Sequence, residues 1–154
     1  MSDLVMGTLE GFPSSREKAM INKLLIVEVP VSSMKRAIEF YAGQLGFFID
    51  LKKNPPSIWE DSREVFMYPA EGIKIMLWQT EGTERLGFTR DGKPHHFLIL
   101  EIVESAEVVR NKLMENGVKV GEISGEIADM GGCGRAFDVW DPDGNILRLC
   151  YRPS

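Results

Sequence analysis

The chain has 154 residues, of which 44% are hydrophobic and 27% are charged, a composition that allows one sizeable buried core. Its 18 Lys and Arg residues against 23 Asp and Glu residues give a net charge of −5, which argues against a nucleic-acid surface. No apolar run approaches the roughly 20 residues of a membrane span, and two distant cysteines, Cys133 and Cys150, fit a reducing compartment. We therefore expect a cytoplasmic protein without nucleic-acid or membrane partners.

Residues 1–20 precede the first regular element and form an N-terminal extension. They include Glu10, Pro13 and Arg16 and lack the apolar stretch of a secretory signal. A terminal segment stays ordered only when something packs against it. We expect a partner subunit to hold this extension, which predicts a homodimer.

A strand and a helix follow the extension. The aliphatic run at residues 24–29 is typical of a strand and ends at Pro30, which cannot donate to a continuing ladder. Ser32 or Ser33 can cap the next helix, and Gly46 can end it in a left-handed conformation. Its apolar positions recur at helical spacing: Met34, Ala37, Ile38, Tyr41 and Leu45. Three short strands are then predicted at residues 47–51, 64–68 and 73–79.

The same order of elements recurs after a polar, glycine-rich linker at residues 80–94. A strand at residues 96–103 precedes a helix at residues 105–116, which Gly117 ends. The inward positions of this helix are Ala106, Val109 and Leu113. Further strands are predicted at residues 118–123, 135–140 and 145–151, and the turn Asp141-Pro142-Asp143-Gly144 joins the last two.

Three pairs of landmarks repeat at nearly the same distance. The hairpin glycines Gly72 and Gly144 lie 72 residues apart, as do Ile26 and Leu98 at the centres of the first strands, and the two helix-ending glycines lie 71 apart. A shared period in separate landmarks indicates a duplication. We therefore expect an α+β fold in which two βαβββ modules, residues 21–79 and 95–154, form a curved eight-stranded mixed sheet around a cavity, with the helices on its outer face.

The alternation of side chains along each strand assigns them to the helix face or to the cavity. Leu25, Val27 and Val29 are expected under the helix. Glu101 also falls on the helix face, where an unpaired carboxylate is costly, and this points to a bulge or a slipped register in its strand. The side chains expected in the cavity are Leu24, Ile26, Glu28, Lys74, Met76, Trp78, His96, Leu98, Ile146, Arg148 and Cys150.

Two segments carry a resemblance to a known family. Glu39-Phe40-Tyr41 precedes Gln44-Leu45-Gly46-Phe47, and residues 137–145 read Phe-Asp-Val-Trp-Asp-Pro-Asp-Gly-Asn before the last strand. These segments resemble the vicinal oxygen chelate superfamily, which includes glyoxalase I, extradiol dioxygenases, fosfomycin-resistance transferases and bleomycin-resistance proteins. The resemblance spans residues 21–151 and implies the duplicated fold rather than one activity.

For the metal-dependent members, the resemblance implies ligands from the first and fourth strands of each module. Carried over residue by residue, these positions fall on Ile26, Met76, Leu98 and Arg148. None of them suits a divalent ion, and the fixed charge of Arg148 repels one. We therefore expect no metal site and no cofactor, which argues against glyoxalase, dioxygenase and thiol-transferase activity because each needs the ion.

Glu28 and His96 keep a polar character inside the expected cavity. If the first strands of the two modules pair antiparallel, these residues lie opposite each other with Cβ atoms about 4.5–5.5 Å apart. They can then act as a general acid/base pair, with Arg148 holding an anionic substrate group. The alternatives are a structural ion pair of Glu28 with Arg148, a His96 that is only a hydrogen-bonded strand residue, and a metal held by Glu28 and His96.

Aromatic side chains can line the cavity or simply fill the core. Trp78 is expected to face the cavity, and the other candidates are Trp59, Phe66, Tyr68 and Trp140. Residues 131–134, Gly-Gly-Cys-Gly, fit a loop at the cavity mouth, because no Lys and helix follow as in a phosphate loop and no base accompanies Cys133.

The sequence favours a small-molecule-binding protein without a catalytic metal. The expected ligand-binding residues are Ile26, Met76, Trp78, Leu98 and Arg148, beside Glu28 and His96. One alternative is a metal-independent lyase or isomerase that uses Glu28 and His96 as catalytic residues. Another is a divalent-metal-dependent lyase or dioxygenase with displaced ligands.

Overall fold

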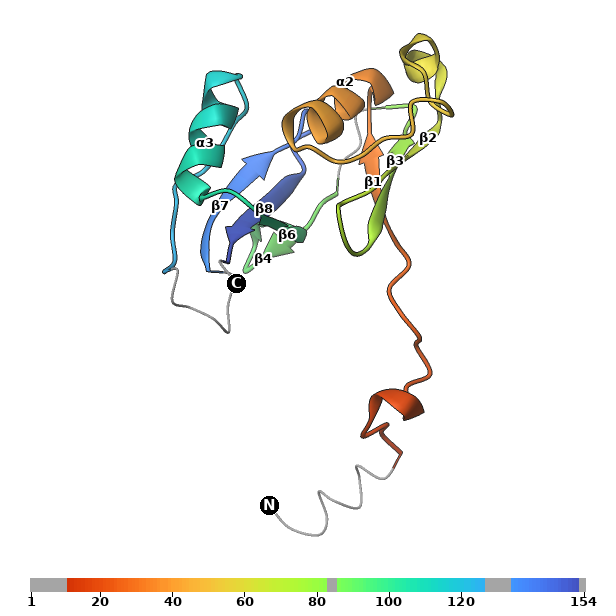
Figure 1. Ribbon diagram of the computed structural model, residues 1–154, viewed down its shortest axis with the longest axis vertical. Helices are drawn as coiled ribbons and strands as arrows, with labels where there is room; N and C mark the ends of the chain where they lie inside the picture. The colour runs from red at the N-terminus through yellow and green to blue at the C-terminus, as the bar shows by residue number, and fades with distance from the viewer. Residues whose placement is uncertain (1–10, 83–85, 127–133, 153–154) are drawn as a thin grey trace.

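The computed structural model describes residues 11–82, 86–126 and 134–152. Two modules lie side by side, each with a helix packed on a small sheet (Figure 1). No helix within these residues has the length and apolar character needed to cross a membrane.

The first module forms a three-stranded sheet in the order β1-β3-β2. Parallel β1 (Ile26–Val31) and antiparallel β2 (Glu64–Met67) flank the central β3 (Lys74–Gln79). A single bridge between Phe48 and Tyr68 is all that remains of the strand predicted at residues 47–51. β1 continues through Pro30, contrary to the prediction, because it lies at the sheet edge and needs no donor on its outer side.

The helix of the first module begins where the sequence predicts. Ser33 caps α2 (Met34–Ile38) by accepting a hydrogen bond from the Arg36 N–H at 3.3 Å. The helix continues as the π-helical turn η2 (Glu39–Gln44) and ends before Gly46, whose φ of 81° favours glycine. Two 3-10 turns complete the helical elements of this half of the chain, η1 (Arg16–Lys18) and η3 (Pro56–Asp61).

The second module repeats this topology. Its sheet has the order β6-β8-β7, formed by β6 (Leu98–Ile102), β7 (Arg135–Trp140) and β8 (Ile146–Tyr151). Ser105 caps α3 (Ala106–Glu115), and isolated bridges from Val120 and Ser124 to β7 replace the predicted strand at residues 118–123. A small hairpin of β4 (Thr89–Arg90) and β5 (Lys93–Pro94) occupies the linker. The duplicated α+β architecture is therefore confirmed, while hydrogen bonding divides the expected eight strands between two sheets.

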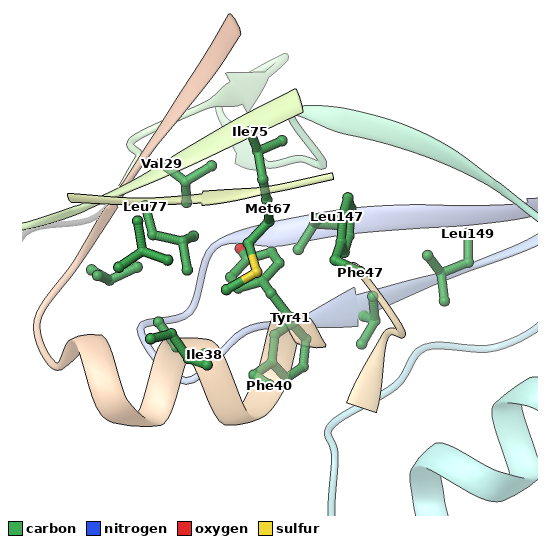
Figure 2. Close-up of a cluster of buried hydrophobic side chains, with 14 of the residues drawn as sticks. Val29, Ile38, Phe40, Tyr41, Phe47, Met67, Ile75, Leu77, Leu147 and Leu149 are labelled. Carbon is green, nitrogen blue, oxygen red and sulfur yellow. The ribbon is translucent and has the colours of Figure 1, made fainter. Parts of the chain in front are cut away.

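One buried cluster joins the two modules. Its members from the first sheet, such as Val29 and Leu77, share it with Phe137, Leu147 and Leu149 of the second. Figure 2 shows side chains from both halves of the chain gathered there. Because each sheet turns one face toward this common core, the opposite faces point away from it. The cavity that we expected both modules to line together is therefore not formed within one chain.

The register of β6 corrects the predicted repeat by one residue. Glu28 pairs with Met76 in the first sheet, and Ile99 pairs with Arg148 in the second. The first strands thus repeat at 71 residues and the last at 72, and a shift of one residue exchanges the faces of a strand. Leu98 consequently packs toward the core, and Glu101 lies on the open face, so the predicted cavity position of Leu98 is wrong and Glu101 is no anomaly.

A buried hydrogen-bond network fastens the modules together. The Tyr41 hydroxyl donates to Asp141 Oδ2 at 2.8 Å, and Asp141 also accepts from the Asn145 backbone N–H and side-chain amide, each at 2.8 Å. Asn145 in turn donates to the Pro30 carbonyl at 3.2 Å. Burial raises the pKa of the Asp141 carboxyl above its usual value, and the hydrogen bonds from Asn145 and Tyr41 oppose that rise.

The N-terminal segment leaves the body of the molecule. Residues 11–25 are exposed, and Figure 1 shows this segment running away from both sheets. Packing within the chain therefore does not hold the part of the extension that the structure describes. Residues 1–10 lie outside the described residues.

Cys150 is buried in β8 and is disulfide-bonded. This bond gives no support to the expectation of a reducing compartment.

We expect Tyr41→Phe to lower the free energy of unfolding by about 1–2 kcal/mol, because buried Asp141 loses one donor. Urea denaturation measures this change. Tyr68→Phe is the matched control, since Tyr68 is partly exposed and its hydroxyl forms no hydrogen bond within the described residues. Equal stability of the two variants would contradict the importance of the Tyr41–Asp141 contact.

Candidate ligand-binding site

The predicted site residues are divided between two open sheet faces. Ile26, Glu28, Met76 and Trp78 share the open face of the first sheet, as their alternation predicts. Arg148 lies on the open face of the second sheet. Glu28 and His96 are not cross-strand neighbours, because β1 pairs with β3 and β6 pairs with β8. The antiparallel pairing on which their predicted contact depended is therefore wrong.

His96 and Arg148 meet through Asp138, which the sequence analysis did not select. Asp138 and Arg148 are register partners in β7 and β8, and Arg148 Nε donates to Asp138 Oδ1 at 2.8 Å. His96 Nδ1 lies 3.4 Å from the same oxygen, and only 10% of the His96 side chain is exposed. Alternation was the available signal, since Asp138 lies between buried Phe137 and Val139 and therefore shares the face of Arg148.

The surroundings of His96 favour its neutral form. Burial lowers the pKa of the imidazole, and the positive charges of Arg148 and His95 lower it further, against the opposing effect of Asp138. His96 Nδ1 is buried without a hydrogen-bond partner, so the approach to Asp138 is electrostatic rather than a formed bond. A neutral imidazole in this position can accept a proton or a hydrogen bond.

A cavity of about 660 Å³ lies next to this cluster. The linker forms one wall, held where the Leu86 N–H donates to Asn145 Oδ1 at 2.7 Å and where the β4–β5 hairpin folds back. The turn at residues 141–144 and the segment after α3 form the other walls. The cavity has an aromatic lining with few polar groups, which includes Phe40, Phe88, His95, Phe97, Lys119 and Trp140.

The cavity and the polar cluster form one continuous site. Trp140 and Ile146 are register partners that line the cavity, and Asp138 and Arg148 are the next outward-facing pair along the same two strands. His95 lines the cavity as well, and its ring centroid lies 3.9 Å from that of His96. A ligand held by the aromatic walls therefore has polar groups within one step along the sheet.

The predicted ligand residues of the first sheet do not line this cavity. Trp78 is 41% exposed on the open face, and a cavity of about 540 Å³ lies beside that sheet, next to Lys74 and Tyr68. Of the other aromatic candidates, Trp59 packs against the core, with its indole N–H donating to the Asn54 carbonyl. Of the stretch at residues 131–134, only Gly134 belongs to the described residues.

The residues at the implied metal positions do not fit a divalent ion. Ile26 and Met76 lie on one sheet, while Leu98 packs toward the core and Arg148 carries a positive charge. Within the part of the chain that the structure describes, no three His, Cys, Asp or Glu side chains gather closely enough to hold a metal ion.

Comparison with known proteins places these features in context. The family model described as "Glyoxalase/Bleomycin resistance protein/Dioxygenase superfamily" matches residues 23–149. A search of curated proteins finds no match.

Solved structures share the fold at low sequence identity. TnmS3, an antibiotic binding protein from Streptomyces sp. CB03234, is 23% identical with a TM-score of 0.63, covering 88% of this chain and 99% of its own. A glyoxalase/dioxygenase from Nostoc punctiforme is 16% identical with a TM-score of 0.63, covering 94% and 100%. TioX from Micromonospora sp. ML1 is 17% identical with a TM-score of 0.58, covering 84% and 98%.

We expect His96 to titrate below the usual histidine pKa of about 6.5, and Arg148→Met to raise its pKa by removing a nearby positive charge. NMR titration of the imidazole C–H signals measures both values, and His95→Gln assigns the signals because the chain has only two histidines. The unfolded chain binds this proton more readily, so the contribution of His96 to stability falls as the pH drops below about 6.5. A His96 pKa above 6.5 would contradict the electrostatic description of the cluster.

Proposed function

This chain belongs to the glyoxalase/bleomycin resistance protein/dioxygenase superfamily, and from that premise we propose that it binds a small organic molecule in the cavity beside its second sheet. The observation that carries the proposal is the aromatic-lined cavity of about 660 Å³ next to the Asp138 cluster. Cavities of this size with apolar walls and a few polar groups are typical ligand sites. The antibiotic-binding description of TnmS3 supports binding, rather than chemistry, as the role of this fold here.

The structure moves the centre of the proposed site relative to the sequence expectation. His96 and Arg148 keep their proposed roles, while Asp138 replaces Glu28 as the carboxylate beside them. The aromatic wall is Trp140 rather than Trp78. Ile26, Met76 and Trp78 stay a proposed second surface on the first sheet.

A metal-independent lyase or isomerase is the second candidate function. It is supported by His96, whose lowered pKa suits proton abstraction and whose neighbour Asp138 can orient the ring. Arg148 already pairs with Asp138, so it must share that partner before it can anchor an anionic substrate. Binding requires none of this proton transfer, which is why the binding role is the simpler proposal.

We expect Trp140→Ala to abolish the thermal stabilisation by small organic molecules identified in a screen of the wild-type protein, because it removes a wall of the cavity. A ligand present at 100 times its Kd stabilises the folded state by about 2.7 kcal/mol, a shift that is readily measured. Phe88→Ala should weaken the same ligands, and it is unlikely to disturb folding because Phe88 is 51% exposed at the rim.

Trp78→Ala is the matched control for this experiment. Trp78 lies outside the cavity, and it is exposed on the first sheet, so its removal should leave the stabilisation unchanged. Loss of stabilisation in Trp78→Ala alone would place the ligand on the first sheet and overturn the proposed site.

We also propose that the chain forms a homodimer through its N-terminal arm, defined as residues 11–25. The arm carries exposed apolar side chains that contact nothing sizeable in their own chain, including Phe12, Met20, Ile21, Leu24 and Leu25. A second copy would remove this apolar surface from water. β1 and β6 are also free sheet edges within the described strands, where strands of another chain can approach.

We expect the double variant Ile21→Asp/Leu24→Asp to shift the protein toward the monomer, because charged side chains oppose burial of the arm. Analytical ultracentrifugation over a range of concentrations measures the change. Val108→Asp is the control, since Val108 is an equally exposed apolar residue on α3. A monomeric wild-type protein, or a dimer that the double variant leaves intact, would refute the role of the arm.

A further inference from the structure

The cation at the cavity has no carboxylate partner. Lys119 lines the cavity, and its ammonium lies 4.6 Å from the centroid of the Trp140 ring. The Lys119 side chain forms no ion pair with any residue that the structure describes. A cation–π contact leaves the ammonium able to bind an anion. The aromatic wall therefore ends in an available positive charge.

The carboxylate at the cavity, in contrast, is already occupied. Asp141 lines the same space, but its side chain is buried and accepts hydrogen bonds from the Tyr41 hydroxyl, the Asp143 N–H and two groups of Asn145. To bind a cationic ligand, this carboxylate would have to give up donors that join the two modules. The cavity consequently offers a cationic ligand little and an anionic ligand a direct partner.

Further positive charge surrounds the neighbouring cluster. Arg148, His95 and Arg90 all act to lower the pKa of His96, with burial the largest cause, and Asp138 opposes them. Arg90 belongs to the β4–β5 hairpin beside the cavity, and Asp138 is paired with Arg148. The local field is thus positive although the whole chain has a net charge of −5.

From these contacts we infer that the cavity selects a planar aromatic molecule that carries a carboxylate or another anionic group. The ring lies against Phe88, Phe97 and Trp140, and the anion pairs with Lys119. This inference rests on the proposed function, because it specifies the ligand of the same cavity. It goes beyond that function by excluding cationic ligands of the same shape.

Three probes that share one ring system test the inference: 2-naphthoate, methyl 2-naphthoate and (2-naphthyl)methylammonium. We expect calorimetric titration to show that 2-naphthoate binds about fivefold more tightly than its uncharged ester and that the ammonium compound binds most weakly. Lys119→Met should remove the preference for naphthoate over the ester, and Lys119→Arg should retain it. Lys53→Met is the control, because Lys53 is an exposed lysine outside the cavity.

The outcomes separate the inference from the proposed function. If the ester or the ammonium compound binds as tightly as naphthoate, and Trp140→Ala still abolishes binding, the cavity is the site and the inferred charge is wrong. A preference for naphthoate that persists in Lys119→Met would also overturn the inference. If Trp140→Ala and Phe88→Ala leave the binding of all three probes unchanged, the cavity is not the site and the proposed function fails with the inference.

Discussion

The buried carboxylate of Asp141 is the contact on which the arrangement of the two modules depends. It belongs to the turn of the second module, yet its donors include the Tyr41 hydroxyl of the first. The same turn also reaches the first module through Asn145, which contacts the Pro30 carbonyl, and Asp143, which accepts from Ser32. An unpaired buried carboxylate is costly, so these donors fix one relative position of the two halves.

This fixed position decides where a ligand can bind. Because the core faces of both sheets share one cluster, the open faces point apart, and the cavity forms instead where the linker crosses the turn after β7. Asn145 serves both purposes, since its side-chain amide group donates to Asp141 while its carbonyl oxygen accepts from Leu86 of the linker. The contact that holds the modules therefore also holds a wall of the proposed site.

The fold alone leaves binding and catalysis open, because one superfamily description covers glyoxalases, resistance proteins and dioxygenases. The side chains at the site carry the distinction. Arg148 is paired with Asp138, His96 is held largely uncharged, and Lys119 lies beside an aromatic wall. Such a set suits recognition of shape and charge, and it offers no cluster of metal ligands among the described residues.

Local signals in the sequence were sufficient to predict the duplicated α+β modules, because helix caps, glycines with positive φ and strand alternation act within a few residues. The meeting of His96, Asp138 and Arg148 was only partly predictable, since Arg148 and Asp138 lie on adjacent strands whose register no local pattern records. The repeat misled at Leu98, where an offset of one residue reverses the face. Tertiary packing alone decided that the two open faces separate and that the linker encloses a cavity, because both result from contacts between distant segments.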